Sequence, residues 1–319
     1  MTQREKNPFP YSDSNKRYYT YDYYLRRRYG GKTAKIPLDA GMTCPNLDGR
    51  CGVGGCIYCS GRGSGDFAAS PALSFAEQYA LVREQLARKW PTDRCIPYLQ
   101  AHTNTYAPPE VLRQRYAEAL ALPGAVGLNI ATRADCLPNK VIAVLNEVSA
   151  QTDLTVELGL QSAHDVTAAR INRGHSWAQF LDGYTRLREG APRAMICVHL
   201  IFGLPGEDGE MMRETVRRTA ALHPDGVKIH LLHVLRDTAL AEEYLAGRYE
   251  PMTRDAYIET VCDALELLPP ETVICRLTGD GMGEALLAPE WSRRKVSVIN
   301  DIDKMMYSRN SMQGMHFEE

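Results

Sequence analysis

Short apolar runs alternate with helix-like segments along most of the chain, and this alternation limits the available folds more than any other feature. The expected strands are Lys35–Leu38, Ile96–Leu99, Val126–Ile130, Leu154–Leu160, Met195–Phe202 and Val227–Leu232. The helix-like segments between them include Ser74–Trp90, Pro109–Leu120, Pro138–Ala150 and Trp177–Glu189. Continuous apolar strands separated by helices are typical of a parallel sheet buried on both faces. Six such units are too few to close an eight-stranded barrel, so the pattern favours an α/β fold with a partial (β/α)6 barrel similar to the TIM barrel.

The position of these repeats gives the expected domain boundaries. We expect residues 33–238 to form the partial barrel, preceded by a basic and aromatic extension at residues 1–32. Residues 239–319 are expected to form a C-terminal α/β extension packed on the barrel, in which Thr272–Leu277 has the pattern of one more strand. A chain of 319 residues with 44% hydrophobic content can bury a core of this size.

Residues 14–35 form a local basic and aromatic segment, although the formal net charge of the whole chain is only −2. The segment holds seven Lys and Arg residues against a single Asp, with six tyrosines between them. Because cations neutralise phosphates and tyrosine rings stack on bases, we expect Tyr18–Arg28 and the later cluster Arg293–Lys295 to contact phosphates of an RNA. An amphipathic helix whose tyrosines pack on the barrel explains the first segment equally well.

The apolar runs and the cysteines indicate the cellular compartment. No apolar run reaches the roughly 18 residues of a membrane span. The nine cysteines are odd in number and scattered, which favours free thiols in a reducing compartment over a disulfide framework. We therefore expect a cytoplasmic protein that does not enter a membrane.

Residues 43–60 place four of the nine cysteines in a glycine-rich loop directly after the first expected strand. Cys56 and Cys59 form a C-x-x-C pair, and eleven residues separate Cys44 from Cys56. Three thiolates can hold three irons of a [4Fe-4S] cluster and leave the fourth iron open for chemistry. Cys51 is an alternative first ligand because its spacing to Cys56 is shorter. Zinc is the alternative metal, although no second C-x-x-C pair follows within the next thirty residues.

This loop, with Tyr58 between the last two cysteines, resembles the cluster loop of the radical S-adenosylmethionine (radical SAM) enzymes. Its long first spacing resembles that of the YhcC/YtqA-like family within them. The GLPGE sequence at residues 203–207 strengthens the resemblance, which covers roughly residues 15–305. The segment at residues 132–135 is similar to the TRPD sequence of the related Elongator catalytic-subunit-like proteins.

The resemblance implies a [4Fe-4S] cluster on Cys44, Cys56 and Cys59 and S-adenosylmethionine as the source of a 5′-deoxyadenosyl radical. It also implies an external electron donor of the flavodoxin or ferredoxin type. The residues that it assigns to S-adenosylmethionine are Tyr58, Thr103, Gln161, Arg173, His199 and Gly203. A satisfied core histidine is the alternative interpretation of His199.

Lys228, His230 and Arg133 are the candidate catalytic residues. Two-residue spacing along the sixth expected strand puts Lys228 and His230 on the same face of the sheet. Arg133 follows the third strand, and the alternative interpretation is that it pairs with Asp135 in the core.

Relatives in the resembled families act on the wobble uridine of tRNA. The resemblance therefore implies an enzyme that modifies the C5 substituent of this base, in a step of the carboxymethylaminomethyl to aminomethyl type. Two other functions remain open at this point. One is a radical SAM enzyme that acts on a small metabolite, and the other is a non-catalytic RNA-binding protein stabilised by zinc or a cluster.

Overall fold

Seven parallel strands form one curled sheet in the computed structural model, which describes residues 7–63, 65, 67–87, 91–279 and 283–318. The strands are β1 (Ala34–Leu38), β2 (Cys95–Leu99), β3 (Gly127–Thr132), β4 (Asp153–Gln161), β5 (Met195–Phe202), β6 (Gly226–Leu231) and β8 (Val273–Arg276). Their spatial order is β1-β2-β3-β4-β5-β6-β8, and every neighbouring pair is parallel. The predicted partial barrel is therefore confirmed, with a seventh strand, β8, that the sequence analysis had assigned to the C-terminal extension.

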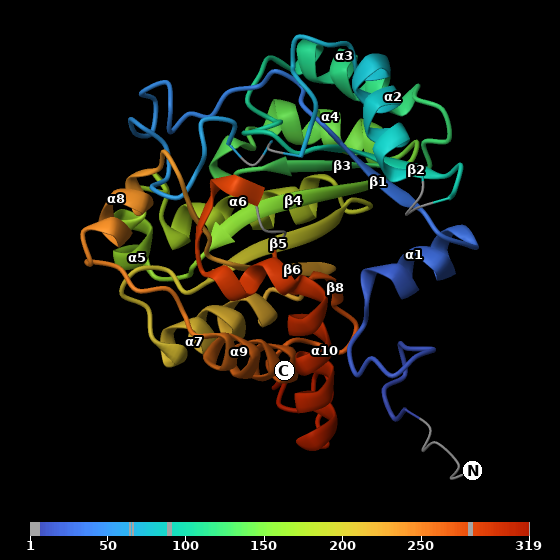
Figure 1. Cartoon of the computed structure of the whole chain (residues 1–319). Coiled ribbons are helices and arrows are strands. Elements are labelled where there is room, and N and C mark those ends of the chain that lie inside the picture. Colours follow the sequence, from blue (N-terminus) through green and yellow to red (C-terminus); the bar gives the residue numbers. More distant parts are fainter. Residues whose placement is uncertain (1–6, 64, 66, 88–90, 280–282, 319) are drawn as a thin grey trace.

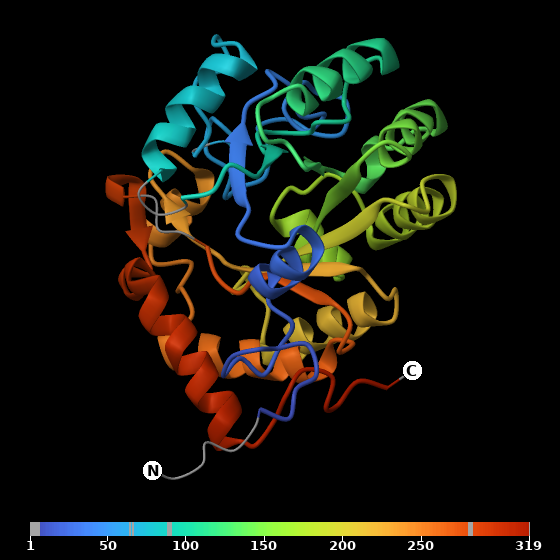
Figure 2. The same ribbon diagram turned by 90° about the vertical axis from the view of Figure 1, so that its right-hand side faces the viewer.

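Helices cover the outer face of this sheet, as a half-barrel requires (Figures 1 and 2). They are α2 (Phe75–Leu86), α3 (Pro109–Leu120), α4 (Asn139–Ser149), α6 (Trp177–Gly190), α7 (Gly209–Ala220) and α9 (Arg254–Leu267). Helix α2 begins at a capping box, in which the side chains of Ser74 and Glu77 each accept from the other residue's backbone amide. Residues 88–90 of the predicted Ser74–Trp90 helix and residues 1–6 of the predicted N-terminal extension lie outside the described residues.

Further elements connect or flank the barrel units. They are the helices α1 (Tyr21–Tyr29), α5 (Asp165–Arg170), α8 (Ala239–Leu245) and α10 (Lys295–Ser308), the 3-10 helices η1 (Ala134–Cys136), η2 (Gly283–Ala285) and η3 (Glu290–Arg294), and the antiparallel strands β7 (Val234–Leu235) and β9 (Leu286–Ala288). In the part of the chain that the structure describes, no helix combines the length and apolar character needed to cross a membrane.

Helix α1 lies across the amino ends of the barrel strands, on the opposite side from the cysteine loop (Figure 1). Thr20, which caps it, forms an isolated parallel bridge with Ile274 of β8. Arg28 makes two hydrogen bonds to the carboxylate of Asp153, at the start of β4. The basic side chains of α1 are thus engaged largely within the protein. This agrees with the interpretation of the segment as a helix that packs on the barrel.

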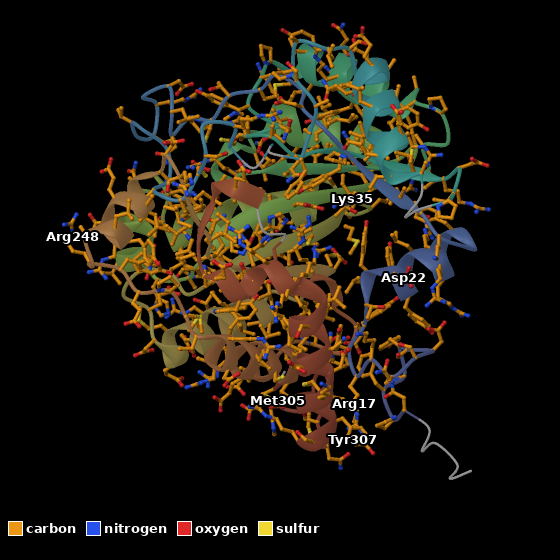
Figure 3. All side chains as sticks on the ribbon, viewed as in Figure 1. Arg17, Asp22, Lys35, Arg248, Met305 and Tyr307 are labelled. Carbon is orange, nitrogen blue, oxygen red and sulfur yellow. The ribbon has the colours of Figure 1, made fainter. Side chains whose placement is uncertain are left out.

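The residues that precede α1 contact the C-terminal part of the chain. The backbone amide of Tyr19 donates to Oε1 of Gln313 at 2.9 Å, and Lys16 forms an ion pair with Asp303 of α10. The guanidinium of Arg17 lies 5.1 Å from the ring centroid of Tyr307, and Figure 3 shows these two side chains at the end of α10. The two ends of the described chain thus meet beneath the barrel.

Candidate active site

A single cavity of about 460 Å³ at the carboxyl ends of the strands brings the predicted site residues together. Its wall includes the three predicted cluster ligands and all three predicted catalytic residues. Of the residues predicted to bind S-adenosylmethionine, only Gly203 is missing from the lining. The carboxyl ends of parallel barrel strands are where enzymes of this architecture carry out chemistry.

The cysteine loop is held over this cavity by the segment that follows α5. The side chain of Asn172 donates to the carbonyl oxygens of Val53 and Gly55 at 3.0 and 2.7 Å. In return, the Asn46 amide donates to the carbonyl oxygen of Asn172. Gly55 has a φ of +75°, a conformation that only glycine adopts readily, so the backbone can turn here without strain.

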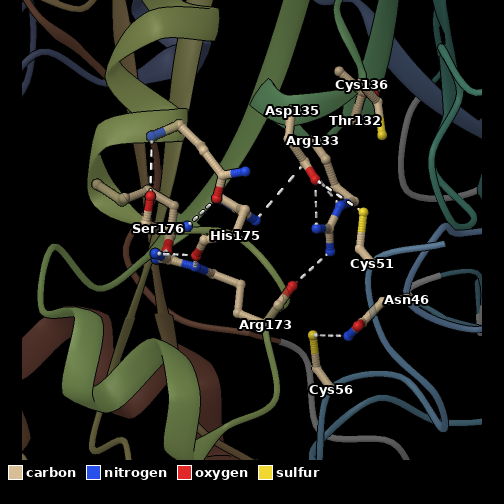
Figure 4. A network of polar contacts seen from close by, with 12 residues as sticks. Asn46, Cys51, Cys56, Thr132, Arg133, Asp135, Cys136, Arg173, His175 and Ser176 are labelled. Atoms are coloured by element: carbon tan, nitrogen blue, oxygen red, sulfur yellow. Dashed lines mark hydrogen bonds and ion pairs between the residues drawn. The ribbon is translucent and has the colours of Figure 1, made fainter. Parts of the chain in front are cut away.

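Cys44, Cys56 and Cys59 are half-buried and line the cavity, whereas Cys51 is exposed and does not line it. The Cys51 thiol points instead toward Asp135, with its sulfur 3.7 Å from Oδ2 (Figure 4). This arrangement favours Cys44 over Cys51 as the first ligand of a cluster.

The chemistry of these thiols fits an iron–sulfur cluster. A hydrogen bond from Cys59 lowers the pKa of Cys56 to about 7, so that its thiolate, the form that binds metals, is well populated near neutral pH. The Asn46 amide also donates to the sulfur of Cys56, at 3.8 Å (Figure 4). Among the residues described by the structure, no three His, Cys, Asp or Glu side chains are gathered closely enough to hold a single metal ion.

Arg133 is engaged in a network at the end of β3 (Figure 4). Its Nε and Nη2 donate to the two carboxylate oxygens of Asp135 at 3.0 and 2.8 Å, and its Nη1 donates to the carbonyl oxygen of Arg173 at 2.7 Å. Both members of the pair are nearly buried. The geometry of Arg133 therefore agrees with the alternative interpretation of a core ion pair. Through its bond to the Arg173 carbonyl, Arg133 also ties β3 to the loop after α5.

Arg173 is fully buried, and its guanidinium binds backbone carbonyl groups. It donates to the carbonyl oxygens of Leu160, Ser162 and His175. The predicted contact with S-adenosylmethionine stays a prediction, and in this structure Arg173 holds together the loops that form one wall of the cavity.

The other predicted cofactor residues occupy distinct places around the cavity. Thr103 is buried, and its amide donates to the carbonyl oxygen of Thr43 at 3.2 Å, which ties the loop after β2 to the cysteine loop. Gln161 ends β4 with a φ of +64°. Tyr58 packs on the second hydrophobic cluster of the protein, which includes Leu204.

Gly203 lies behind the cavity wall. Its carbonyl oxygen accepts a hydrogen bond from the Tyr249 hydroxyl at 2.8 Å. A Cβ at this position would lie only 3.0 Å from Cγ of Met252, and φ is +86°. The positive φ and the close packing of Met252 therefore explain why position 203 requires glycine.

Deeper in the barrel, each of the seven strands contributes one side chain to a set that we call the polar layer. It comprises Lys35, Tyr98, Asn129, Glu157, His199, Lys228 and Arg276, in strand order. Lys35 Nζ and Asn129 Nδ2 donate to Oε1 of Glu157 at 2.6 and 3.0 Å. Oε2 of Glu157 accepts from His199 Nε2 at 3.0 Å and forms an ion pair with Lys228.

The electrostatics of the polar layer are set by burial and by the central carboxylate. Burial acts to raise the pKa of Glu157, but the charges of Lys228 and Lys35 outweigh it and hold this pKa well below its ordinary value. Burial lowers the pKa of His199 to about 4 and that of Lys35 to about 8. At neutral pH, Glu157 is therefore ionised and His199 is neutral.

Sequence analysis missed most of the polar layer. It selected Lys228 and His199, but it treated Lys35 only as a basic residue at the start of the first strand, and it did not select Glu157 or Arg276. One signal was available for Lys35, because strand alternation in β1 separates it from the buried Ala34 and Ile36 and turns it toward the barrel interior.

Comparison with known proteins places the chain in a family. Residues 49–219 match the Radical SAM superfamily, and residues 224–308 match the Radical_SAM C-terminal domain. The chain is 45% identical to the uncharacterized protein YtqA of Bacillus subtilis, over 98% of this chain and 97% of YtqA. It is 35% identical to protein YhcC of Escherichia coli K12, over 91% of this chain and 92% of YhcC.

More distant similarities connect the chain to Elongator complex protein 3. It is 28% identical to the Bos taurus protein over 52% of this chain and 30% of that protein. The structure of Elp3 from Methanocaldococcus infernus superimposes with a TM-score of 0.67 at 20% identity, covering 88% of this chain and 64% of that one. At this identity the superposition shows a shared fold.

Proposed function

We propose a function from the premise that this chain belongs to the radical SAM superfamily, in the group that contains YtqA and YhcC. The proposed substrate is the wobble uridine of a tRNA. The proposed reaction remodels the C5 substituent of this base, in a step of the carboxymethylaminomethyl to aminomethyl type. The observation that carries the proposal is the convergence of three thiols and the barrel's polar side chains on one cavity.

The residues proposed to hold the cofactors, all except Gly203, line this cavity. Cys44, Cys56 and Cys59 would hold a [4Fe-4S] cluster, and Thr103 and Gln161 would contact S-adenosylmethionine together with Tyr58, Arg173, His199 and, through its backbone, Gly203. When bound, the cluster and S-adenosylmethionine supply a 5′-deoxyadenosyl radical that abstracts a hydrogen atom. An external flavodoxin or ferredoxin would provide the electron, in the cytoplasm.

The protein's own residues would orient the substrate and keep water away from the reacting atoms. Lys228 and His230 both line the cavity, on the face predicted from their spacing. Arg133, which is bound to Asp135, would act by positioning the wall beside the cysteine loop.

The proposed tRNA substrate is supported by the sequence similarity to Elongator complex protein 3. The proposed phosphate contacts need revision from the structure, because Arg26 is paired with Asp13 and Asp22, and Arg28 with Asp153. Arg27 is exposed, and within the described ranges it forms no ion pair, so we propose Arg27 as a phosphate contact on α1.

Nucleoside analysis of tRNA from a strain that lacks the gene tests the proposal. We expect the carboxymethylaminomethyl nucleoside to accumulate and the aminomethyl type to disappear. The wild-type gene should restore the profile and Cys56→Ala should not, whereas Cys95→Ala is a matched control because Cys95 is buried in β2. An unchanged tRNA profile would refute the substrate.

A second measurement tests catalysis independently of the substrate. Anaerobically reconstituted protein should form 5′-deoxyadenosine from S-adenosylmethionine when dithionite is added. If iron-loaded, folded protein forms none, the enzymatic function is wrong, and a non-catalytic RNA-binding protein becomes the better description.

A further inference from the structure

The cavity opens at the end of the barrel that is far from helix α1. This helix bears the proposed phosphate contact Arg27 and lies across the amino ends of the strands, opposite the cysteine loop (Figure 1). Strand β4 is nine residues long, so the two ends of the barrel are separated by roughly 30 Å. Arg27 can therefore contact only a part of the tRNA that is distant from the wobble base. The anticodon loop needs contacts of its own beside the cavity.

Phe67 is an exposed aromatic side chain on the wall of this cavity. It is 45% exposed, whereas the other phenylalanines of the chain are buried or half-buried. In the described part of the chain it belongs to neither of the two hydrophobic clusters. A large apolar ring that stays in water at the rim of a cavity gains free energy when a ligand packs against it.

The backbone on both sides of Phe67 is held in place. The guanidinium of Arg62 donates to the carbonyl oxygens of Ala68 and Ala69 at 2.8 and 3.2 Å. The amide of Ala68 donates to the carbonyl oxygen of Gly65 at 2.9 Å, and Ala68 itself is buried. The ring is therefore presented from an ordered turn, so little conformational entropy is lost when a ligand packs on it.

Gly61 lines the same cavity and has no structural need to be glycine. A Cβ at this position would meet no described atom within 4 Å, and φ lies outside the left-handed region. Two turns connect Gly61 to the segment of Phe67, because the amide of Gly63 donates to Ser60 and the amide of Gly65 donates to Arg62. The missing side chain leaves open space on the rim of the cavity, where a flat ligand can approach the backbone.

We propose that Phe67 and Gly61 form a stacking platform for the base next to the modified uridine. This inference rests on the proposed function, and it adds the place where the anticodon loop is held. Proteins bind the unstacked bases of RNA loops on aromatic side chains, and every base has a π-face that can stack in this way. A neighbour that stacks on Phe67 would compensate for the stacking that the wobble base loses when it enters the cavity.

The probe for this platform is an anticodon stem-loop RNA that carries 5-carboxymethylaminomethyluridine at the wobble position. Its dissociation constant is measured anaerobically by fluorescence anisotropy, on reconstituted enzyme with S-adenosylmethionine present. We expect Phe67→Ala to weaken binding by roughly 5- to 150-fold, the range for the loss of one stack between a base and an aromatic ring. Because the ring is uncharged, this factor should be the same at low and high salt. Phe67→Trp should keep the wild-type affinity, whereas Phe67→Leu should lose it.

Tyr307→Ala is the matched control. Tyr307 is another exposed aromatic side chain, but it lies on α10, at the end of the molecule away from the cavity (Figure 3). This variant should bind the stem-loop as the wild type does. Gly61→Leu tests the other half of the platform, because its side chain would fill the open space. It should weaken RNA binding in protein whose iron content and circular dichroism match the wild type.

Tryptophan fluorescence tests the contact directly. Stacking of a base should quench the added emission of Phe67→Trp when the stem-loop binds, whereas the added emission of Tyr307→Trp should not change. Quenching in neither variant overturns the platform.

The affinities give further outcomes. Equal binding of the stem-loop by the wild type and Phe67→Ala overturns the platform while leaving the tRNA substrate in place. If that result comes with weaker binding of S-adenosylmethionine in equilibrium dialysis, Phe67 belongs to the cofactor site. If it comes with slower reduction of the cluster by flavodoxin, Phe67 belongs to the surface that meets the electron donor. If the wild type binds the stem-loop no more tightly than a hairpin with an unrelated loop, the proposed function fails together with the platform.

Discussion

Replacing Glu157 by Gln tests whether the polar layer depends on one buried negative charge. Among the described residues, Glu157 is the only acidic side chain that Lys35 or Lys228 contacts as an ion pair. Glutamine has nearly the same shape and keeps an acceptor oxygen, so the substitution changes mainly the charge. It leaves the buried Lys228 ammonium and the half-buried Lys35 ammonium without a counter-ion.

The size of the effect follows from the geometry. At 2.6 Å, the distance between Lys35 Nζ and Oε1 of Glu157, the Coulomb attraction is about 6 kcal/mol at an effective dielectric constant of ~20. Part of this attraction is offset by the several kcal/mol needed to remove each ion from water. Removing one partner of a buried pair typically costs about 3–5 kcal/mol, and we expect Glu157→Gln to lower the free energy of unfolding by this amount at pH 7.

Urea unfolding followed by circular dichroism measures this loss. The matched control is Glu147→Gln, which breaks an exposed ion pair with Arg113 whose N–O distance is 2.7 Å. Exposed pairs contribute less than about 1 kcal/mol, so this control should change little. Adding Lys35→Met to Glu157→Gln should recover part of the loss, because it removes one of the two unpaired cations. Equal unfolding midpoints for Glu157→Gln and Glu147→Gln would refute the reasoning, since they would mean that water already solvates the polar layer.

Three further predictions concern the cluster, pH and tRNA. Cys44→Ala should lose the iron of anaerobically reconstituted protein while Cys51→Ala keeps it, because only Cys44 lines the cavity; the reverse iron count would make Cys51 the ligand. Burial lowers the pKa of His175 to about 3 from an ordinary 6.5. As the pH falls from 6.5 toward 3, the His175 imidazole is therefore protonated in the unfolded chain but stays neutral in the folded protein. From pH 7 to pH 5 this residue should therefore remove about 2 kcal/mol of stability, and His175→Gln should be less acid-sensitive by that amount in urea unfolding. Arg27→Glu should weaken tRNA binding and reduce its salt dependence by about one charge, whereas Arg28→Glu should mainly lower the thermal unfolding midpoint; tRNA affinity unchanged in Arg27→Glu would contradict the contact.

The fold was largely predictable from the sequence because parallel strands buried on both faces show as continuous apolar runs. The β2 strand, Cys95–Leu99, is buried at every position, and β5 has the predicted bounds. The seventh strand was detected as a pattern, but its membership of the main sheet was not. Its pairing with β6 is set by tertiary contact across α8 and α9, and nothing in the local sequence encodes it.

The site was predictable only in part, for a related reason. The cysteines and the GLPGE turn are contiguous motifs, so sequence spacing reports on them directly. The hydrogen-bond partners of Glu157 come from four other strands, and Lys35 is 122 residues away in sequence. Arg133 and Arg173 are apt for binding an anion, yet both are satisfied by protein acceptors, which only the packed structure reveals.

The contact between the two ends of the described chain has a consequence for biosynthesis. Thr20, Lys16 and Tyr19 find long-range partners on β8, on α10 and at Gln313, all of which leave the ribosome more than 250 residues later. This tyrosine-rich stretch must therefore stay exposed until these partners have been synthesised. A chaperone that shields aromatic segments on nascent chains would meet this stretch early and hold it longest.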